Sequence, residues 1–379
     1  MDKFFFIKYS RTRKRNWDNV GFSMDIVSNV LSRLPVKCLL PFRTVSKLWY
    51  RIIGSPSFMK MHLRYSKYKP IYILYPYVDD VTDVYLVNAS GLTLKTERIT
   101  LPGCENLSFL SLICCHNGLV CFTNCPWVPD SNMTKVIETD VQIRICNPAT
   151  RDVHLLPQGS PSEMEPVVGV AFGLSEYKVF RIFHPKSEPE NDRIECEVYS
   201  PSTGTWRGIG SVPQCPMHSD NVCIDGTVYW FLVSEEDHEI PGAILSVDIE
   251  ENFRIIELPE EVTAHAFLID LDGKLSLVAI YDDDLIMDIW VLRSCSDADY
   301  WDRKCSDYIP YSIIEDTDAA AGRKNEVFII TTEHYYIYDI DRRVWTELDF
   351  EDAFDRNCPN VFSYNESLLP SNGLPNPEL

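Results

Sequence analysis

Residues 114–125 hold the densest group of potential metal ligands in the chain. Four cysteines and one histidine fall there: Cys114, Cys115, His116, Cys121 and Cys125. Zinc sites usually pair their thiolates as Cys-x-x-Cys knuckles, and this spacing does not reproduce that arrangement. Asn117-Gly118 is typical of a two-residue hairpin turn, and cysteine is a common small residue of apolar cores. The pattern favours two buried strands, and we expect no metal and no cofactor.

Two acidic runs, Glu235-Glu236-Asp237 and Asp282-Asp283-Asp284, offer carboxylates to calcium. Neither alternates its ligands as calcium loops do, so solvated turns are the better interpretation. His154, His218 and His265 are isolated in the sequence. A nucleophile elbow, a phosphate-binding glycine loop, a His-Glu-x-x-His helix and a dinucleotide fingerprint are all absent from the sequence. We therefore predict no catalytic residues and a protein that is not an enzyme.

The bulk composition predicts a globular protein of one large domain or two unequal ones, since 45% of the 379 residues are hydrophobic. No apolar run reaches the roughly 18 to 20 residues of a membrane span, so we expect no membrane partner. The 13 cysteines form no obvious disulfide framework, and the N-terminal apolar cluster is shorter than a secretory signal. We expect a cytoplasmic location, a nuclear location, or both.

The charge is divided unevenly along the chain. Residues 1–69 carry 15 Lys or Arg and 3 Asp or Glu, a balance of +12, which leaves −33 for residues 70–379 of the total of −21. Binding to nucleic acid requires clustered basic residues, so the acidic part excludes a nucleic-acid partner. A basic protein substrate fits its charge better. The alternative is that the acidic residues only keep a large domain soluble.

Residues 25–54 show the apolar spacing of short helices. Pro35 ends the first helix, because the residue before a proline is pushed out of the helical region. Pro41 lies in the second segment, where we expect it to break or restart the helix. Gly54 ends the third. Three such helices need a partner or a neighbouring domain for stability. The first carries one apolar stripe, formed by Ile26, Val27, Val30, Leu31 and Leu34.

Beyond Tyr65 the apolar period changes to 2, which predicts an all-β domain. Pairs of an apolar residue and proline recur, and their prolines are 55, 56, 46 and 51 residues apart. This is the repeat length of four-stranded propeller blades. We predict a propeller-like array of about six repeats, with a large sandwich as the alternative because residues 260–310 fit the repeat poorly. The pairs are Leu101-Pro102, Leu156-Pro157, Val212-Pro213, Leu258-Pro259 and Ile309-Pro310.

Large aromatic residues have two predicted roles in this array. Trp206 and Trp345 follow equivalent polar turns, and we expect each ring to pack between adjacent blades. Other rings could be interface anchors on blade-top loops or core residues. These candidates are Tyr75, Trp127, Trp230, Tyr300 and Trp301.

The stretch from Met24 to Trp49 resembles the F-box, and closely its plant form. The resemblance depends on Leu34-Pro35, followed by Val45-Ser46-Lys47 and then Trp49. The family usually opens its first helix with Leu-Pro, whereas Ser23-Met24 stands before Asp25 here, so one adaptor contact is missing or replaced.

The second domain resembles the F-box-associated domain common in plants, which is propeller-like and Kelch-like in its repeats. The segments that carry this resemblance are Cys115-His116-Asn117-Gly118-Leu119-Val120, Asn147-Pro148-Ala149-Thr150-Arg151, Gly173-Leu174 with Tyr177-Lys178-Val179, and Val198-Tyr199-Ser200 leading to Trp206.

Together the resemblances imply a non-catalytic substrate-recognition subunit of an SCF-type cullin ubiquitin ligase. The F-box would bind a Skp-type adaptor and through it a cullin, while the β domain would hold a target protein for ubiquitination and degradation. Proximity would be its contribution to catalysis. The resemblance implies an adaptor face of Leu31, Leu34, Pro35, Leu39, Val45 and Trp49, and it implies no substrate-binding residues.

Two other functions stay open, one narrower and one of another class. A pollen-type self-incompatibility F-box protein that recognises a basic ribonuclease resembles this layout. A propeller enzyme or a small-molecule sensor that carries an F-box is the alternative from another class. In either case we predict a basic, disordered tail over 1–22, a three-helix F-box over 23–65, the β domain over 66–355 and a C-terminal tail over 356–379.

Overall fold

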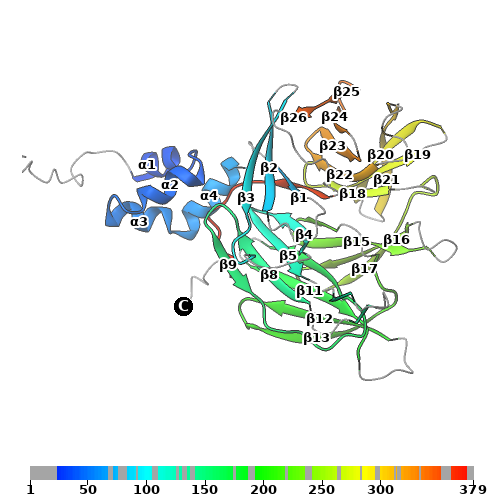
Figure 1. Ribbon diagram of the computed structural model, residues 1–379, viewed down its shortest axis with the longest axis horizontal. Helices are drawn as coiled ribbons and strands as arrows, with labels where there is room; N and C mark the ends of the chain where they lie inside the picture. The colour runs from blue at the N-terminus through cyan, green and yellow to red at the C-terminus, as the bar shows by residue number, and fades with distance from the viewer. Residues whose placement is uncertain are drawn as a thin grey trace, which may run out of the picture.

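The computed structural model describes residues 24–66, 71–75, 83–90, 93–104, 110–124, 128–129, 135–136, 141–173, 176–186, 193–217, 221–234, 241–262, 266–281, 284–294, 299–310, 313, 317–332, 334–350 and 360–373. The N-terminal tail predicted over 1–22 lies outside these residues. The helices lie together at one side of a β-rich domain (Figure 1). None of the described helices is long and apolar enough to cross a membrane.

Four helices occupy the described N-terminal region, one more than the three that the sequence predicted. They are α1 (Met24–Leu31), α2 (Val36–Phe42), α3 (Lys47–Ile53) and α4 (Pro56–Ser66). The additional helix α4 starts with a proline at its first position, which suits a helix start, and Ser55 Oγ accepts the Phe58 N–H at 3.3 Å. Ser46 caps α3 in the same way through the Trp49 N–H.

Pro41 does not break α2, contrary to our expectation. The helix continues through Pro41 to Phe42, and the Arg43 N–H bonds back to the carbonyls of Leu39 and Leu40. Because Pro41 lies in the last turn of a short helix, it removes little of the hydrogen-bond ladder.

The strands form a six-bladed propeller within the described residues, as the repeat length predicted, together with the small ribbon β6 (Val128–Pro129) and β7 (Lys135–Val136). We number the blades in chain order from β1. Blade 1 contains β27 (Asn360–Tyr364), β1 (Ile71–Tyr75), β2 (Asp83–Ser90), β3 (Thr93–Thr100) and the short β26 (Asp349–Phe350). Blade 2 contains β4 (Leu110–His116), β5 (Leu119–Asn124), β8 (Gln142–Asn147) and β9 (Asp152–Leu155). Blade 3 contains β10 (Val167–Phe172), β11 (Tyr177–Phe183), β12 (Ile194–Ser200) and β13 (Thr205–Val212).

The remaining blades are regular antiparallel sheets. Residues 260–310, which matched the repeat poorly, contain the four strands of a complete blade, blade 5. Blade 4 contains β14 (Val222–Ile224), β15 (Thr227–Val233), β16 (Pro241–Asp248) and β17 (Phe253–Glu257). Blade 5 contains β18 (Ala266–Asp270), β19 (Leu275–Tyr281), β20 (Ile286–Ser294) and β21 (Asp299–Tyr308). Blade 6 contains β22 (Thr317–Arg323), β23 (Glu326–Thr331), β24 (Tyr335–Asp339) and β25 (Val344–Glu347).

The C-terminal segment closes the ring, which corrects the tail predicted over 356–379. Strand β27 pairs antiparallel with β1 from Ile71↔Tyr364 to Tyr75↔Asn360, so it is the inner strand of blade 1. Figure 1 shows this red strand beside β1, with the chain continuing toward the helices. The first and last parts of the propeller are therefore joined by main-chain hydrogen bonds.

Six apolar clusters lie between neighbouring blades and form the core of the ring. At the junction of blades 1 and 6, Tyr72 stacks on Phe328 with ring centroids 4.6 Å apart. The inter-blade role predicted for Trp206 and Trp345 is confirmed. The Trp206 Nε1–H donates to the Pro157 carbonyl at 2.7 Å, and the Trp345 Nε1–H donates to that of Tyr308 at 3.0 Å. Each bond joins an outer strand to the end of the preceding blade.

Candidate functional site

The helices expose an unusual share of apolar side chains. Six of the 13 large apolar side chains that are exposed among the described residues lie on or beside α1 and α3. Val30 is 58% exposed and Val45 is 64% exposed. Exposed apolar groups gathered on a small module are typical of a surface that a partner covers. The six are Met24, Ile26, Val30, Val45, Leu48 and Tyr50.

The six residues predicted as an adaptor face are divided by the structure. Leu31 and Leu39 are buried in the helical core, while Leu34 and Trp49 are half-buried against it. Pro35 and Val45 are exposed. The sequence did mark α1 as an apolar stripe, but it could not tell which of its residues face outward.

The exposed apolar groups of the helices are accompanied by positive charge. Residues 24–66 contain seven Lys or Arg and one acidic residue, Asp25. Arg43, Lys47 and Arg51 line a shallow hollow of about 590 Å³ beside α3. The Arg43 guanidinium lies over the Tyr50 ring, 5.1 Å from its centroid, and this contact holds a cation next to an exposed apolar group. The surface suits a partner that is both apolar and acidic.

A second candidate site is the axial cavity of the propeller, which has a volume of about 540 Å³. The inner strands of five blades and Arg64 of α4 line it. Its rim carries charges of both signs. Asp225 and Asp272 come from the inner hairpin turns of blades 4 and 5, and Lys324 comes from that of blade 6.

Four buried polar atoms among the lining residues of the axial cavity have no hydrogen-bond partner in the described part of the chain. They are the Oδ1 atoms of Asn117, Asn221 and Asn365 and the Nε atom of Arg323. A buried polar atom left without a partner costs about 1 to 3 kcal/mol. Each of these atoms has less than 1 Å² of accessible surface, so none of them contacts the open volume of the cavity.

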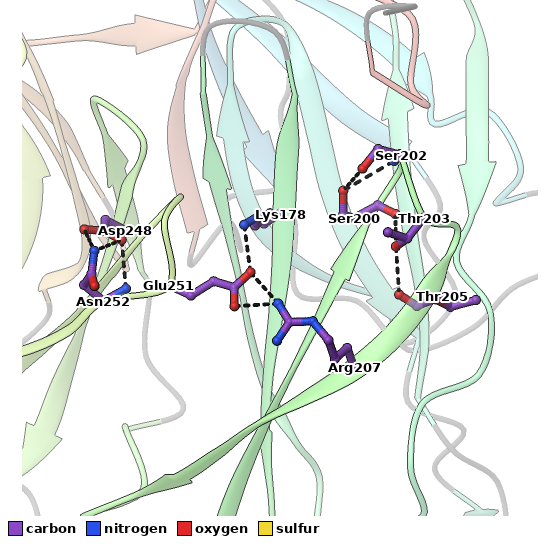
Figure 2. A network of polar contacts seen from close by, with 9 residues as sticks. All are labelled: Lys178, Ser200, Ser202, Thr203, Thr205, Arg207, Asp248, Glu251 and Asn252. Atoms are coloured by element: carbon purple, nitrogen blue, oxygen red, sulfur yellow. Dashed lines mark hydrogen bonds and ion pairs between the residues drawn. The ribbon is translucent and has the colours of Figure 1, made fainter.

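A third candidate is an ion network where blades 3 and 4 meet (Figure 2). One carboxylate, that of Glu251, accepts hydrogen bonds from Lys178 Nζ at 2.7 Å and from Arg207 at 2.6 Å. Burial alone would raise the pKa of Glu251, but the bonds from Lys178 and Arg207 outweigh it and hold this pKa below its ordinary value. Beside the network, a groove of about 290 Å³ is lined by the hydroxyls of Ser200, Ser202, Thr203 and Thr205.

Of the cysteines considered as metal ligands, Cys114 and Cys121 are buried in the propeller core and Cys115 packs against it. Cys114 and Cys121 face each other across β4 and β5, and the turn between these strands has positive φ at Asn117 and Gly118, as the hairpin prediction required. The hydrogen bond that the Cys114 thiol donates to Cys121, together with burial, raises the pKa of Cys114 and keeps its thiol protonated. The described residues contain no group of three or more metal-ligating side chains. Cys125 and the acidic runs lie outside them, except for Asp284.

The aromatic residues proposed as loop anchors are mostly structural. Tyr75 and Trp230 are buried in strands, so of the two predicted roles both are core residues. Trp301 lies in β21 and donates its Nε1–H to the Glu257 carbonyl at 2.8 Å, like the two inter-blade tryptophans. Tyr300 is 55% exposed, but on a strand rather than on a loop. Trp127 lies outside the described residues.

The fold and its exposed helical face define a class of protein in which a small helical module is attached to a β-propeller. Residues 22–61 match the F-box domain family, and residues 88–356 match the F-box associated β-propeller domain family. The chain therefore belongs to the F-box proteins with an F-box associated β-propeller domain.

Curated relatives support this assignment over most of the chain. An F-box protein of Arabidopsis thaliana is 24% identical over 93% of this chain and 98% of its own length. The F-box protein CPR1 of the same plant is 24% identical over 92% and 87%, and an F-box/LRR-repeat protein is 22% identical over 94% and 84%. Among solved structures, TolB from Acinetobacter baumannii is 12% identical over 75% of this chain and 64% of that chain, with a TM-score of 0.43, which bears on neither fold nor function.

Proposed function

We propose that this protein is a substrate receptor of an SCF-type cullin ubiquitin ligase. The helical region over 23–65 would bind a Skp-type adaptor and thereby a cullin. The propeller, over 66–355 together with β27, would hold the target protein in the cytoplasm, the nucleus or both. The chain itself would then perform no bond chemistry, and its contribution would be to bring a target lysine close to activated ubiquitin.

The observation that carries this proposal is the exposed apolar face of the helices. Leu31 and Leu39 hold the helices together from inside, so the contacts to the adaptor fall to the exposed Val30, Val45 and Pro35 and the half-buried Leu34 and Trp49. Basic residues around these groups favour an acidic adaptor and would speed its encounter.

Co-purification with a Skp-type adaptor tests the proposal. Val30→Asp should abolish binding, because truncating or charging a buried interface anchor costs about 2 kcal/mol or more. Leu34→Ala combined with Pro35→Ala should have the same effect. Ile255→Asp is the matched control, since Ile255 is 55% exposed but lies on the propeller strand β17. Wild-type recovery of the adaptor by the Val30 and Leu34/Pro35 variants would disprove this adaptor face.

For the target, the −33 balance of residues 70–379 supports a basic protein. Association of such a target should slow as salt rises, while its dissociation should change much less. A basic secreted ribonuclease recognised by a pollen-type protein is one target that would fit. An acidic target, or an association rate that salt does not affect, would contradict the electrostatic part of the proposal.

A small-molecule sensor is the second candidate function, and the axial cavity of about 540 Å³, with charges of both signs at its rim, favours it. A sensor of this kind would bind a metabolite tightly without any protein partner. Native mass spectrometry of the purified chain, which detects a retained small molecule by its mass, separates the two candidates. The receptor proposal expects no retained metabolite and a protein partner that the propeller recruits.

A further inference from the structure

The residues that follow β27 are buried, whereas a free C-terminal tail would be exposed to solvent. We call residues 365–373 the C-terminal strap. Ser367, Leu368 and Ser371 are each at most 4% exposed, although they follow the last strand of the propeller. The strap passes from blade 1 between the helices and blades 2 and 3, and it contacts all of them.

On one side the strap is built into the helical region. The Val36 N–H at the start of α2 donates to Glu366 Oε2 at 3.1 Å, and Ser66 Oγ at the end of α4 donates to the Glu366 carbonyl at 2.6 Å. Leu368 completes the core of the helices with Leu31, Val36, Leu39, Ile53 and Phe58. The helices therefore share their core with the last residues of the chain.

On the other side the strap is held by residues of blades 2 and 3. Asn147, which is fully buried, donates through Nδ2 to the carbonyls of Ser367 at 3.0 Å and Leu369 at 2.8 Å. Asp152 Oδ2 accepts from the Ser371 N–H at 2.7 Å and from its hydroxyl at 2.9 Å. The Tyr177 hydroxyl donates to the Ser371 carbonyl at 2.8 Å.

Gly118 leaves space for the strap where it starts. A Cβ atom at this position would lie 2.5 Å from Ser367 Oγ and 2.6 Å from the Asn365 carbonyl oxygen, distances that real Cβ atoms do not show. Gly118, Asn147 and Tyr177 all belong to the segments through which the sequence resembles the F-box-associated domain. These residues face the strap, so the characteristic segments of the domain serve its connection to the helices here.

We infer that the strap is the element that fixes the helices relative to the propeller, and that Gly118 and Asn147 are positioning residues for ubiquitin transfer. The second half of this inference rests on the ligase role proposed above. A fixed joint keeps the bound target in one place relative to the adaptor-bound enzyme, whereas a loose joint spreads its lysines over a larger volume and lowers their effective concentration.

The test compares Gly118→Ala with Gly273→Ala in the full chain. Both glycines lie in two-residue hairpin turns, with φ of +80° and +77°, so the backbone strain of an alanine is matched. A Cβ at Gly273 meets nothing within 4 Å, and only the Gly118 variant must displace the strap. Hydrogen exchange at 367–371 reports whether the strap is released.

Fluorophores on encoded ketone residues at the exposed positions Lys47 and Tyr308 report the distance between helices and propeller. We expect Gly118→Ala to widen the distance distribution about twofold or more, because a domain pair without a tight interface moves freely. Gly273→Ala should match wild type. A second route to release is Asp152→Ala combined with Tyr177→Phe, which removes the anchors of Ser371 without touching the turn.

In the reconstituted ligase, transfer to the propeller's own lysines is the functional readout. At saturating adaptor, Gly118→Ala should slow this transfer at least about threefold while adaptor affinity stays at the Gly273→Ala value. A released strap with an unchanged distance distribution would overturn the inference. If wild type transfers no ubiquitin, the ligase role fails, yet the distance measurement still decides whether the strap fixes the joint.

Discussion

The propeller and the helices bury their apolar residues in opposite ways. The propeller distributes its core over six clusters at the junctions between neighbouring blades, and β27 closes the circle. The helices have one cluster of six buried residues, one of which is Leu368 from the strap, and they leave Val30 and Val45 exposed. In a closed ring every blade buries its apolar faces against its two neighbours. So small a helical module needs the strap to complete its core and a partner to cover its exposed apolar side chains.

Removing residues 360–379 should have the largest effect, because these residues contribute both to the propeller and to the core of the helices. The deletion takes away β27, which pairs with all five residues of β1, and the Leu368 side chain from the helical core. We expect a loss larger than the 4 to 5 kcal/mol that is already exceptional for a point mutation. Thermal unfolding followed by circular dichroism should show no cooperative transition. Deletion of 374–379 alone is the control, and an intact transition in the longer deletion would show that the ring closes without β27.

Leu39→Ala and Leu277→Ala separate the two regions, because both side chains are fully buried, one in the helices and one in the propeller. Each should cost about 2 to 5 kcal/mol. In Leu39→Ala, hydrogen exchange should rise in α1 to α4 while the blades stay protected. In Leu277→Ala, protection should fall in blades 4 and 5. Equal losses throughout the chain in both variants would mean that helices and propeller unfold as one unit.

Much of the fold could be predicted from the sequence, because local patterns repeat along it. The proline spacing gave six repeats, and the positions of Trp206 and Trp345 after polar turns gave their packing between blades. The pairing of β27 with β1 has no such local signal. The five residues of either strand do not indicate which distant strand they pair with. The same holds for Glu366, whose partner Val36 is 330 residues distant.

The candidate site was harder to predict than the fold. An apolar stripe tells which residues share a helix face, but Leu31 and Leu39 turn inward and Val30 turns outward only once the helices pack. The segments around Gly118 and Asn147 were recognisable, yet their role became clear only through the strap. Trp230 could not be separated from a loop anchor, because burial depends on the neighbouring blade.

A smaller effect is expected from Trp206→Phe, which removes the bond from Nε1 to the Pro157 carbonyl and keeps most of the ring between blades 2 and 3. One neutral hydrogen bond contributes about 0.5 to 1.5 kcal/mol. Denaturant unfolding should therefore show a modest loss of stability with an unchanged m-value. Trp301→Phe, which removes the equivalent bond to Glu257 between blades 4 and 5, should cost a similar amount. If neither variant loses stability, the aromatic rings stabilise these blade junctions by packing alone, and the hydrogen bonds contribute nothing measurable.

The smallest expected effect concerns His62, which is buried in α4 beside the strap. Its Nε2–H donates to the Leu34 carbonyl at 3.0 Å, and its buried Nδ1 has no partner among the described residues. Burial lowers the pKa of His62 below the ordinary 6.5, although the Leu34 carbonyl and the Glu366 carboxylate act in the opposite direction. The folded state therefore favours the neutral ring.

Because the unfolded chain takes up a proton on this ring at higher pH than the folded chain does, stability should fall as pH drops below 6.5 toward the folded pKa. Protection factors for hydrogen exchange in α2 and α4 should accordingly fall between about pH 7.5 and about pH 5.5, more than those in the blades. His62→Gln, whose amide can still donate to the Leu34 carbonyl, should remove this difference. His154→Gln is the control, since burial also lowers the pKa of His154 but this residue lies in blade 2 and bonds with Tyr199. If the helices and the blades respond equally to pH in wild type, burial of His62 does not make the helices more sensitive to pH than the propeller.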